Sequence, residues 1–584
     1  TQSSTLFPYT TLFRSSGGTR RECGHHRASL PAERPRRRTM TTTRSPASTP
    51  WRRRATAGAA LAVLLAALGA APAAAQQPPA ARGLPSLGDA GEMTTLEERK
   101  LGDAIIRELY RDPDYIDDPI VGEYVDGLWR ALLDGARARG ELPPELDERY
   151  AWRVLLGRDR SINAFALPGG YFGLHLGLVG VVSSRAELAS VLAHELSHIT
   201  QRHIPRLLGQ EKRQTPLMMA ALVAGMIAAS KNPQAGAALA VGGQAAVIQQ
   251  QLNFSRDMER EADRIGYGIL VQAGFDGQGF VSMFEKLQGA TRINDNGDWP
   301  YLRSHPLTTQ RIGDMQQRAQ ALPRGGSQAA SAPREAAERG GAADLEALLV
   351  AARARVLGRP GVDVLRAWAG EPSQPGFAER PLAPRAGALY AAALAQAQLR
   401  DLPRAQALAT QLALAVAGDA RAARQARLLQ AELALQAGQP ARTLELLGAS
   451  ADRPARADGA SQAGRAALLL RAQAQTASGQ AAQAADALQV WVSDHPQDAG
   501  AWQALAQARA AQGQTLRALR AEGEVPMAQL DYAGAVDRWR AAQDFSRRAP
   551  GGAADLIEAS IVDTRLRQAQ ALLQQQRLDE QKRR

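Results

Sequence analysis

The distribution of apolar and polar residues predicts two kinds of structure in this chain. Apolar runs near residues 152–156 and 163–176 are typical of strands, and Pro168-Gly169-Gly170 breaks the second run as a turn would. The C-terminal half is rich in Ala, Leu, Gln and Arg and contains helical repeats. We therefore predict a mainly α protein, in which an α+β domain with a small sheet precedes a domain of α-helical repeats.

Gly-Gln pairs punctuate the C-terminal half. They recur at residues 479–480 and 513–514, a spacing of 34 residues, which is the period of tetratricopeptide repeats. The segment around Trp502 fits the first helix of such a unit, and residues 485–496 fit the second. Stacked helix pairs form a concave surface that binds protein. We expect partner recruitment here, and a helical bundle without a partner is the alternative.

The two halves are separated by a stretch without apolar periodicity. Residues 323–343 are rich in Gly, Ala, Ser and Pro, as linkers are. About 500 residues follow the N-terminal leader, which is too many for one core. We predict one domain at 84–322 and the repeat domain at 344–584.

Two apolar stretches, 217–230 and 235–248, lie in the first domain and are separated by Lys231-Asn232-Pro233. Each is too short to span a bilayer comfortably. We expect a helical hairpin that shields a cleft and makes peripheral contact with a membrane or a partner. A plain buried hairpin is the alternative.

The charge of the chain is concentrated at its start. Residues 1–75 contain twelve Arg, no Lys and two Glu, so they carry +10 of the formal net charge of +12. The rest of the chain has no basic stripe interleaved with aromatic residues, so we expect no nucleic-acid partner.

This N-terminal part has two sections. Residues 1–39 resemble a translated sequencing adapter followed by aperiodic Arg/Pro-rich text, and we expect translation to begin at Met40. Residues 40–75 have the charged, apolar and small-residue regions of a cleavable signal peptide, which implies export to the periplasm. A retained membrane anchor is the alternative. Cys23 is the single cysteine of the chain, so thiol chemistry and a disulfide framework are not expected in the mature protein.

Candidate chemistry lies in the apolar segment that follows residue 184. Ser184 and Glu187 have the spacing of a capping box and predict a helix start. On that helix His194 and His198 are four residues apart and share a face, so both reach one metal ion. Glu195 is placed to act on water beside the metal. This H-E-x-x-H arrangement is typical of zinc peptidases, although it also arises by chance.

A second segment can complete the site. A catalytic zinc ion needs a third protein ligand and an open position. Glu259 is the candidate ligand, and Asp263, one helical turn later, can hydrogen-bond a ligand histidine. With no cysteine available, we expect one Zn²⁺ per chain held by His and Glu.

These two segments together, His194 to His198 and Ser255-Arg256-x-x-Glu259-x-x-Ala262-Asp263, resemble the HtpX-like gluzincin metallopeptidases. The resemblance implies that His194, His198 and Glu259 bind zinc and that Glu195 is the catalytic base.

A third match lies on the predicted strand. By the same resemblance the segment Asn163-Ala164-Phe165-Ala166 lies beside the cleft, where an edge strand aligns the substrate backbone. An ordinary core hairpin is the alternative.

A fourth match narrows the subfamily. His305-Pro306 followed by Arg311-Ile312 resembles a segment of the periplasmic β-barrel-assembly-enhancing proteases. The resemblance implies that His305 is a fourth, inhibitory zinc ligand, and we expect Arg311 to support the ligands from outside. Local capping or packing by His305 is the alternative.

The expected function is a periplasmic zinc endopeptidase, with chaperone activity as a further role, in quality control of outer-membrane protein assembly. The resemblance implies misassembled outer-membrane β-barrel proteins as substrates and the barrel-assembly machinery as partner of the repeats. The alternative is a non-proteolytic chaperone or adaptor with a permanently closed zinc site.

Overall fold

The computed structural model describes residues 93–209, 256–293, 300–321, 344–448, 464–548 and 553–583. The expected leader, signal peptide, apolar hairpin and linker lie outside these residues. Within them helices predominate and the strands form one four-stranded sheet, so the prediction of a mainly α fold with a small sheet is confirmed. No helix in the described ranges has the length and apolar character needed to cross a membrane.

The sheet has the strand order β1-β2-β4-β3, which puts β3 at an edge of the described sheet. β2 pairs with β4 in parallel, and the other two pairs are antiparallel. The predicted apolar run at 163–176 is a hairpin whose turn contains Gly169 and Gly170, both with positive φ, a conformation that favours glycine. The strands are β1 (Tyr115–Ile116), β2 (Arg153–Gly157), β3 (Ala164–Leu167) and β4 (Tyr171–His175).

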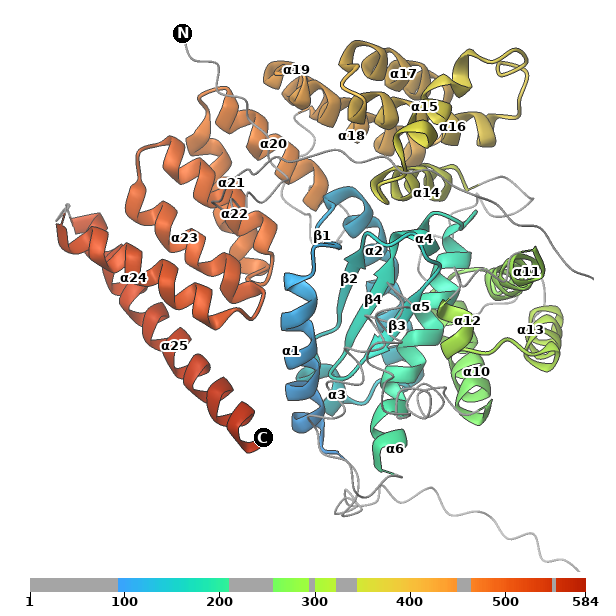
Figure 1. Cartoon of the computed structure of the whole chain (residues 1–584), viewed down its shortest axis with the longest axis horizontal. Coiled ribbons are helices and arrows are strands. Elements are labelled where there is room, and N and C mark those ends of the chain that lie inside the picture. Colours follow the sequence, from blue (N-terminus) through green and yellow to red (C-terminus); the bar gives the residue numbers. More distant parts are fainter. Residues whose placement is uncertain are drawn as a thin grey trace, which may run out of the picture. The chain divides into compact units, whose positions relative to one another are not determined.

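The helix α5 (Arg185–Thr200) lies between the sheet and the helices α10 (Arg256–Gln272) and α11 (Gln278–Ile293), as Figure 1 shows. From Ala186 to Thr200 every residue of α5 is buried. Gly266 permits the close approach of α10, because a Cβ there would lie 2.9 Å from the carbonyl oxygen of Ala193. The residues of α10 one and two turns before Gly266 therefore face the middle of α5.

The start of α5 differs from the predicted capping box. The Ser184 side chain accepts a hydrogen bond from the Glu187 amide at 3.2 Å, as expected. The Glu187 carboxylate does not return this bond to Ser184; it accepts from the Ser183 amide at 2.6 Å and pairs with Lys286 of α11 at 2.6 Å. Glu187 thereby ties the start of α5 to α11.

Shorter and flanking helices complete this half of the fold. They are α1 (Thr95–Arg111), α2 (Pro119–Arg139), α3 (Pro144–Arg149), α4 (Leu176–Val179), α6 (His203–Gly209), α12 (Pro300–Ser304) and α13 (Thr309–Ala321).

The C-terminal half consists of successive helices joined by short turns. Gly479 and Gly513, at the predicted punctuation, have positive φ and end α20 and α22. The assignment to tetratricopeptide repeats stays a prediction. The helices are α14 (Leu345–Leu357), α15 (Val362–Gly370), a 3₁₀ turn (Glu371–Ser373), α16 (Leu382–Gln398), α17 (Leu402–Ala415), α18 (Ala420–Gln436), α19 (Pro440–Leu447), α20 (Arg465–Ala477), α21 (Ala481–Asp494), α22 (Ala499–Ala511), α23 (Thr515–Ala528), α24 (Tyr532–Arg548) and α25 (Ala553–Arg583).

The helix α14 belongs to two cores. One of its faces is buried with residues of the sheet, α2 and α5, and the other with α16 and α17. Arg353 of α14 is also buried, and it forms ion pairs with Asp118 at 2.6 Å and Glu432 at 2.7 Å. α14, the first helix after the predicted boundary at residue 344, is thus buried against both halves. The boundary itself stays a prediction.

The packing of α1 on the β3–β4 turn gives a stability prediction. A Cβ at Gly102 would lie 2.0 Å from the carbonyl oxygen of Pro168, so Gly102→Ala forces the helix and the hairpin apart. We expect a loss of about 1–3 kcal/mol in the free energy of unfolding, the usual cost of overpacking. The matched control is Gly127→Ala on α2, where a Cβ meets nothing within 4 Å and should stabilise by about 0.5–1 kcal/mol. Urea unfolding curves measure both. Equal stability of the two variants would contradict the packing.

Candidate metal centre

Two histidines on adjacent turns of α5 form the centre of the site. His194 and His198 are each 1% exposed, and their Nε2 atoms lie 3.0 Å apart. Their spacing of four residues places both rings on the face of α5 that α10 covers. The predicted pair therefore points at one position inside the protein.

The helix α10 brings the predicted carboxylates to this position. Glu259 Oε1 lies 3.4 Å from His198 Nε2, and Glu259 Oε2 lies 3.5 Å from His194 Nε2. Asp263 contacts the opposite side of the His194 ring, with Oδ1 3.0 Å from Nδ1. Glu259 thus faces both histidines, and Asp263 lies behind His194; their roles as ligand and supporting residue stay predictions.

Arg311 of α13 holds both carboxylates. Its guanidinium contacts the two oxygens of Asp263 at 2.6 and 2.8 Å and Glu259 Oε2 at 2.8 Å. Burial alone would raise the pKa of Glu259, but His305 and His194 hold it well below the usual value. Burial opposes the charged form of His194 too, yet the hydrogen bonds to Asp263 and Glu259 raise its pKa to about 9.

His305 enters the same cluster from the turn after α12. Its Nδ1 atom lies 3.0 Å from Glu259 Oε1 and 3.4 Å from His194 Nε2. Its Nε2 atom lies 3.3 Å from Glu195 Oε1. The Tyr301 ring packs on the imidazole, with ring centroids 4.8 Å apart. His305 therefore lies between the candidate ligands and the candidate base.

The donor set suits a metal ion. One atom from each of four buried residues lies within 4.8 Å of the others, and the residues are His194, His198, Glu259 and His305. Asp263 lies at Nδ1 of His194, so that ring directs its Nε2 atom inward. There it meets His198 Nε2 and the Glu259 carboxylate, at a position that a proton or a metal ion can occupy. Imidazole nitrogen and carboxylate oxygen are ligands that zinc accepts, so zinc fits this group.

Glu195 connects the metal cluster to the sheet. It is fully buried, and its Oε2 atom accepts a hydrogen bond from the Ala166 amide of β3 at 3.0 Å. Burial raises its pKa, which makes the carboxylate a stronger proton acceptor than a free glutamate.

The four predicted substrate-strand residues do not all direct their backbone groups to the same side of the strand. Asn163 precedes β3, and its carbonyl accepts from the His175 amide, so its backbone faces β4. Alternation then turns the backbone groups of Ala164 and Ala166 away from β4. The Phe165 ring covers Gly173, where a Cβ would lie 2.2 Å from the ring. The outward backbone groups of β3 are therefore on the side of Glu195.

A further pair of residues, which the sequence reasoning missed, lies behind His198. His203 Nδ1 is 2.8 Å from His198 Nδ1, and His203 Nε2 is 3.1 Å from Glu261 Oε2. Burial lowers the pKa of His203 to about 4 although Glu261 opposes this. The sequence suggests a surface or structural role for His203, because position 203 is off the face of His198 on an unbroken helix.

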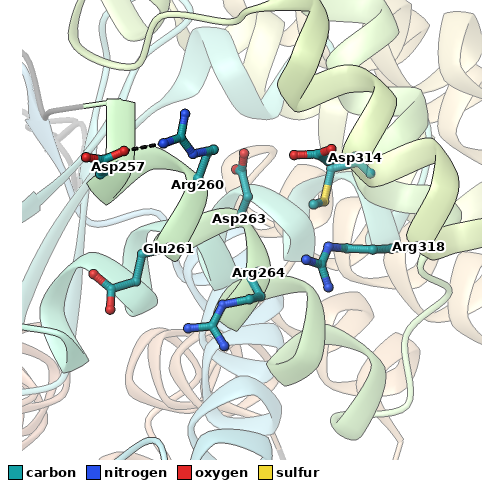
Figure 2. A pocket seen from close by; sticks show the side chains of 8 residues that line it. Asp257, Arg260, Glu261, Asp263, Arg264, Asp314 and Arg318 are labelled. Carbon is teal, nitrogen blue, oxygen red and sulfur yellow. Dashed lines mark hydrogen bonds and ion pairs between the residues drawn. The ribbon is translucent and has the colours of Figure 1, made fainter. Parts of the chain in front are cut away.

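A charged hollow of about 340 Å³ lies between α10 and α13 (Figure 2). Neither His194 nor His198 lines it. Its lining residues are Asp257, Arg260, Glu261, Asp263, Arg264, Asp314, Met315 and Arg318.

The chain has recognisable relatives. Residues 139–319 match the family model described as Peptidase family M48. A putative beta-barrel assembly-enhancing protease of Vibrio cholerae is 38% identical over 242 residues, which are 41% of this chain and 48% of the relative. The beta-barrel assembly-enhancing protease of Escherichia coli K12 is 33% identical over 238 residues, 40% of this chain and 47% of the relative.

A more distant relative is the mitochondrial metalloendopeptidase OMA1 of Arabidopsis thaliana, 32% identical over 164 residues, 28% of this chain and 31% of the relative. The chain spans about half the length of the bacterial relatives it matches. The matched residues contain the H-E-x-x-H helix, Glu259 and His305. Residues 139–319 are therefore similar to Peptidase family M48, and the chain that contains them resembles the beta-barrel assembly-enhancing proteases.

Proposed function

We propose that this protein is a zinc-dependent endopeptidase that acts in the periplasm on outer-membrane proteins during their assembly. The observation that carries the proposal is the position of Glu195. Its carboxylate lies between the His194–His198–Glu259 cluster and the outward amide of Ala166 on the edge strand. A peptide bound along that strand would lie within reach of both the metal ligands and a buried base.

The residues divide the chemistry among them. His194, His198 and Glu259 would hold the ion, and Asp263 and Arg311 orient His194 and Glu259. A bound zinc ion supplies Lewis-acid chemistry, which polarises a carbonyl group and makes water more acidic. Glu195 accepts a proton from the attacking water at its carboxylate and delivers it to the departing amide nitrogen. One proton is taken up and released, so the carboxylate is regenerated in each turnover.

Substrate binding follows from the edge of the sheet. The backbone groups of Ala164 and Ala166 face away from β4 and can pair with an extended segment by β-augmentation. An unfolded or misassembled β-barrel protein presents such segments, because its strands lack their partners. The names of the bacterial relatives support outer-membrane β-barrel proteins as the substrate class.

The roles proposed for the repeats, the signal peptide and the apolar segment are inferred from the sequence. The helical repeats of the C-terminal half recruit substrates and the barrel-assembly machinery, and they supply chaperone activity. The signal peptide at 40–75 sends the chain to the periplasm. The apolar stretches 217–230 and 235–248 lie outside the described residues, and their sequence favours a role in shielding the site and in contact with a membrane or a partner.

His305 regulates the site in this proposal. Its Nδ1 atom lies among the ligands, and its Nε2 atom lies 3.3 Å from Glu195, so it occupies the space that a substrate carbonyl and the attacking water need. The same position favours a second candidate function, a repeat-based chaperone or adaptor whose metal site stays closed. The two candidates differ in whether His305 leaves the cluster.

Substitution of the base tests the enzyme directly. Glu195→Gln keeps the size and the Ala166 contact but cannot accept the proton, so we expect cleavage of unfolded casein and of an unfolded outer-membrane β-barrel protein to fall by about 100-fold or more. Zinc content should stay unchanged, because Glu195 is not a ligand. Chelation should abolish cleavage by the unaltered chain, and added zinc should restore it. Full activity in Glu195→Gln would contradict the assignment of the base.

Substitution of His305 tests the regulation. His305→Ala opens a position in the cluster and frees Glu195, so we expect faster cleavage of the same substrates at saturating zinc. His495→Ala is the matched control, since His495 stacks on Trp491 in the repeat half and should leave the rate unchanged. No cleavage by zinc-loaded His305→Ala would reject the enzyme and favour the adaptor.

A further inference from the structure

The chain breaks its helix directly after the two histidines of α5. α5 ends at Thr200, Arg202 has φ +52, and α6 starts at His203. A positive φ is unfavourable for a residue other than glycine, so other contacts must stabilise it. The Arg202 guanidinium contacts the buried Glu98 at 3.2 Å and the carbonyl of Met93. These contacts hold the break, and the break turns His203 back towards His198.

The contacts of His203 form a chain that ends at a carboxylate. Nδ1 of His203 lies 2.8 Å from Nδ1 of His198, and Nε2 of His203 lies 3.1 Å from Glu261. Glu261 also pairs with Arg206 of α6 at 2.9 Å. The His203 side chain is fully buried, whereas Glu261 is partly exposed. The route from His198 therefore runs outward through His203 to an acid near the surface.

The donors and acceptors along this chain follow from the carboxylate at its outer end. Glu261 can only accept when ionised, so His203 donates from Nε2. A neutral His203 then accepts at Nδ1, and the proton in that bond belongs to Nδ1 of His198. His198 is left with its lone pair on Nε2, the atom that faces His194 and Glu259.

We propose that His203, oriented by Glu261, is a positioning residue that fixes the tautomer and ring orientation of His198 for metal binding. The two ligand histidines are then supported in different ways. Asp263 contacts Nδ1 of His194 directly, whereas His198 receives the same support through an intervening imidazole. His203 is not itself a ligand, because it touches His198 on the side opposite to the cluster. The inference rests on the proposed zinc site and adds a residue to it.

The experiment measures zinc release from the full chain in a Glu195→Gln background, where no self-cleavage interferes. His203→Leu fills the buried space without an acceptor, and His203→Asn restores a carbonyl oxygen near the position of Nδ1. We expect zinc transfer to a chelator to be about 10–100-fold faster in His203→Leu, the usual effect of losing such a partner. His203→Asn should recover most of that loss. Circular dichroism and the melting temperature report folding for each variant.

Two acids on α10 provide a matched pair that does not disturb the buried site. Asp257 lies one helical turn before Glu261 on α10 and pairs with Arg260, as Figure 2 shows. Glu261→Ala should accelerate zinc release, by less than His203→Leu does, and Asp257→Ala should leave it unchanged.

The outcomes separate the inference from the function on which it rests. Unchanged zinc release in His203→Leu overturns the positioning role. Equal acceleration in the Leu and Asn variants also overturns it, because it assigns His203 to packing alone. A Glu195→Gln chain that binds no zinc overturns the metal site itself, and with it both proposals.

Discussion

Everything at the site depends on two imidazole nitrogens that face one another 3.0 Å apart inside the protein. At that distance the two atoms need a positive charge between them, either the proton that the raised pKa of His194 retains or a metal ion. The residues behind the two rings keep both Nε2 atoms directed inward. Asp263 lies against the outer nitrogen of His194, and His203 lies against the outer nitrogen of His198. A metal ion can replace the proton among the same nitrogens, so the contacts behind the rings are as much part of the candidate metal site as the candidate ligands.

Glu259, the third candidate ligand, is positioned by packing between helices. Gly266 lets α10 approach the backbone of α5 at Ala193, and Glu259 lies about two turns earlier on α10. Arg311 then neutralises Glu259 and Asp263 together from α13. A buried carboxylate without such a partner would cost several kcal/mol or take up a proton. The absence of a side chain at Gly266 and the positive charge of Arg311 therefore both help to place the Glu259 carboxylate beside the two histidines.

Residue spacing predicts part of this site. The rest depends on contacts between elements that are distant in the sequence. His194 and His198 share a face on any α-helix, so local geometry alone places them together. Glu259 and His305 come from other elements, and the role of His305 required a resemblance. His203 escaped prediction because a helix continued past residue 200 would point it elsewhere; only the positive φ of Arg202, held by the distant Glu98, returns it to His198. Likewise the Glu187 carboxylate pairs with Lys286 on α11, a contact that sequence spacing does not predict.

The short segment that carries His305 contacts both the candidate metal cluster and the residues just before the edge strand. Its Tyr301 amide donates to the carbonyl of Ile162 at 3.3 Å, two residues before β3 begins. His305 itself contacts Glu259 and Glu195. A movement of this segment large enough to withdraw the imidazole would also break the contact next to the edge strand. In the proposed enzyme, withdrawal of His305 from the cluster would therefore also disturb the backbone just before the edge strand.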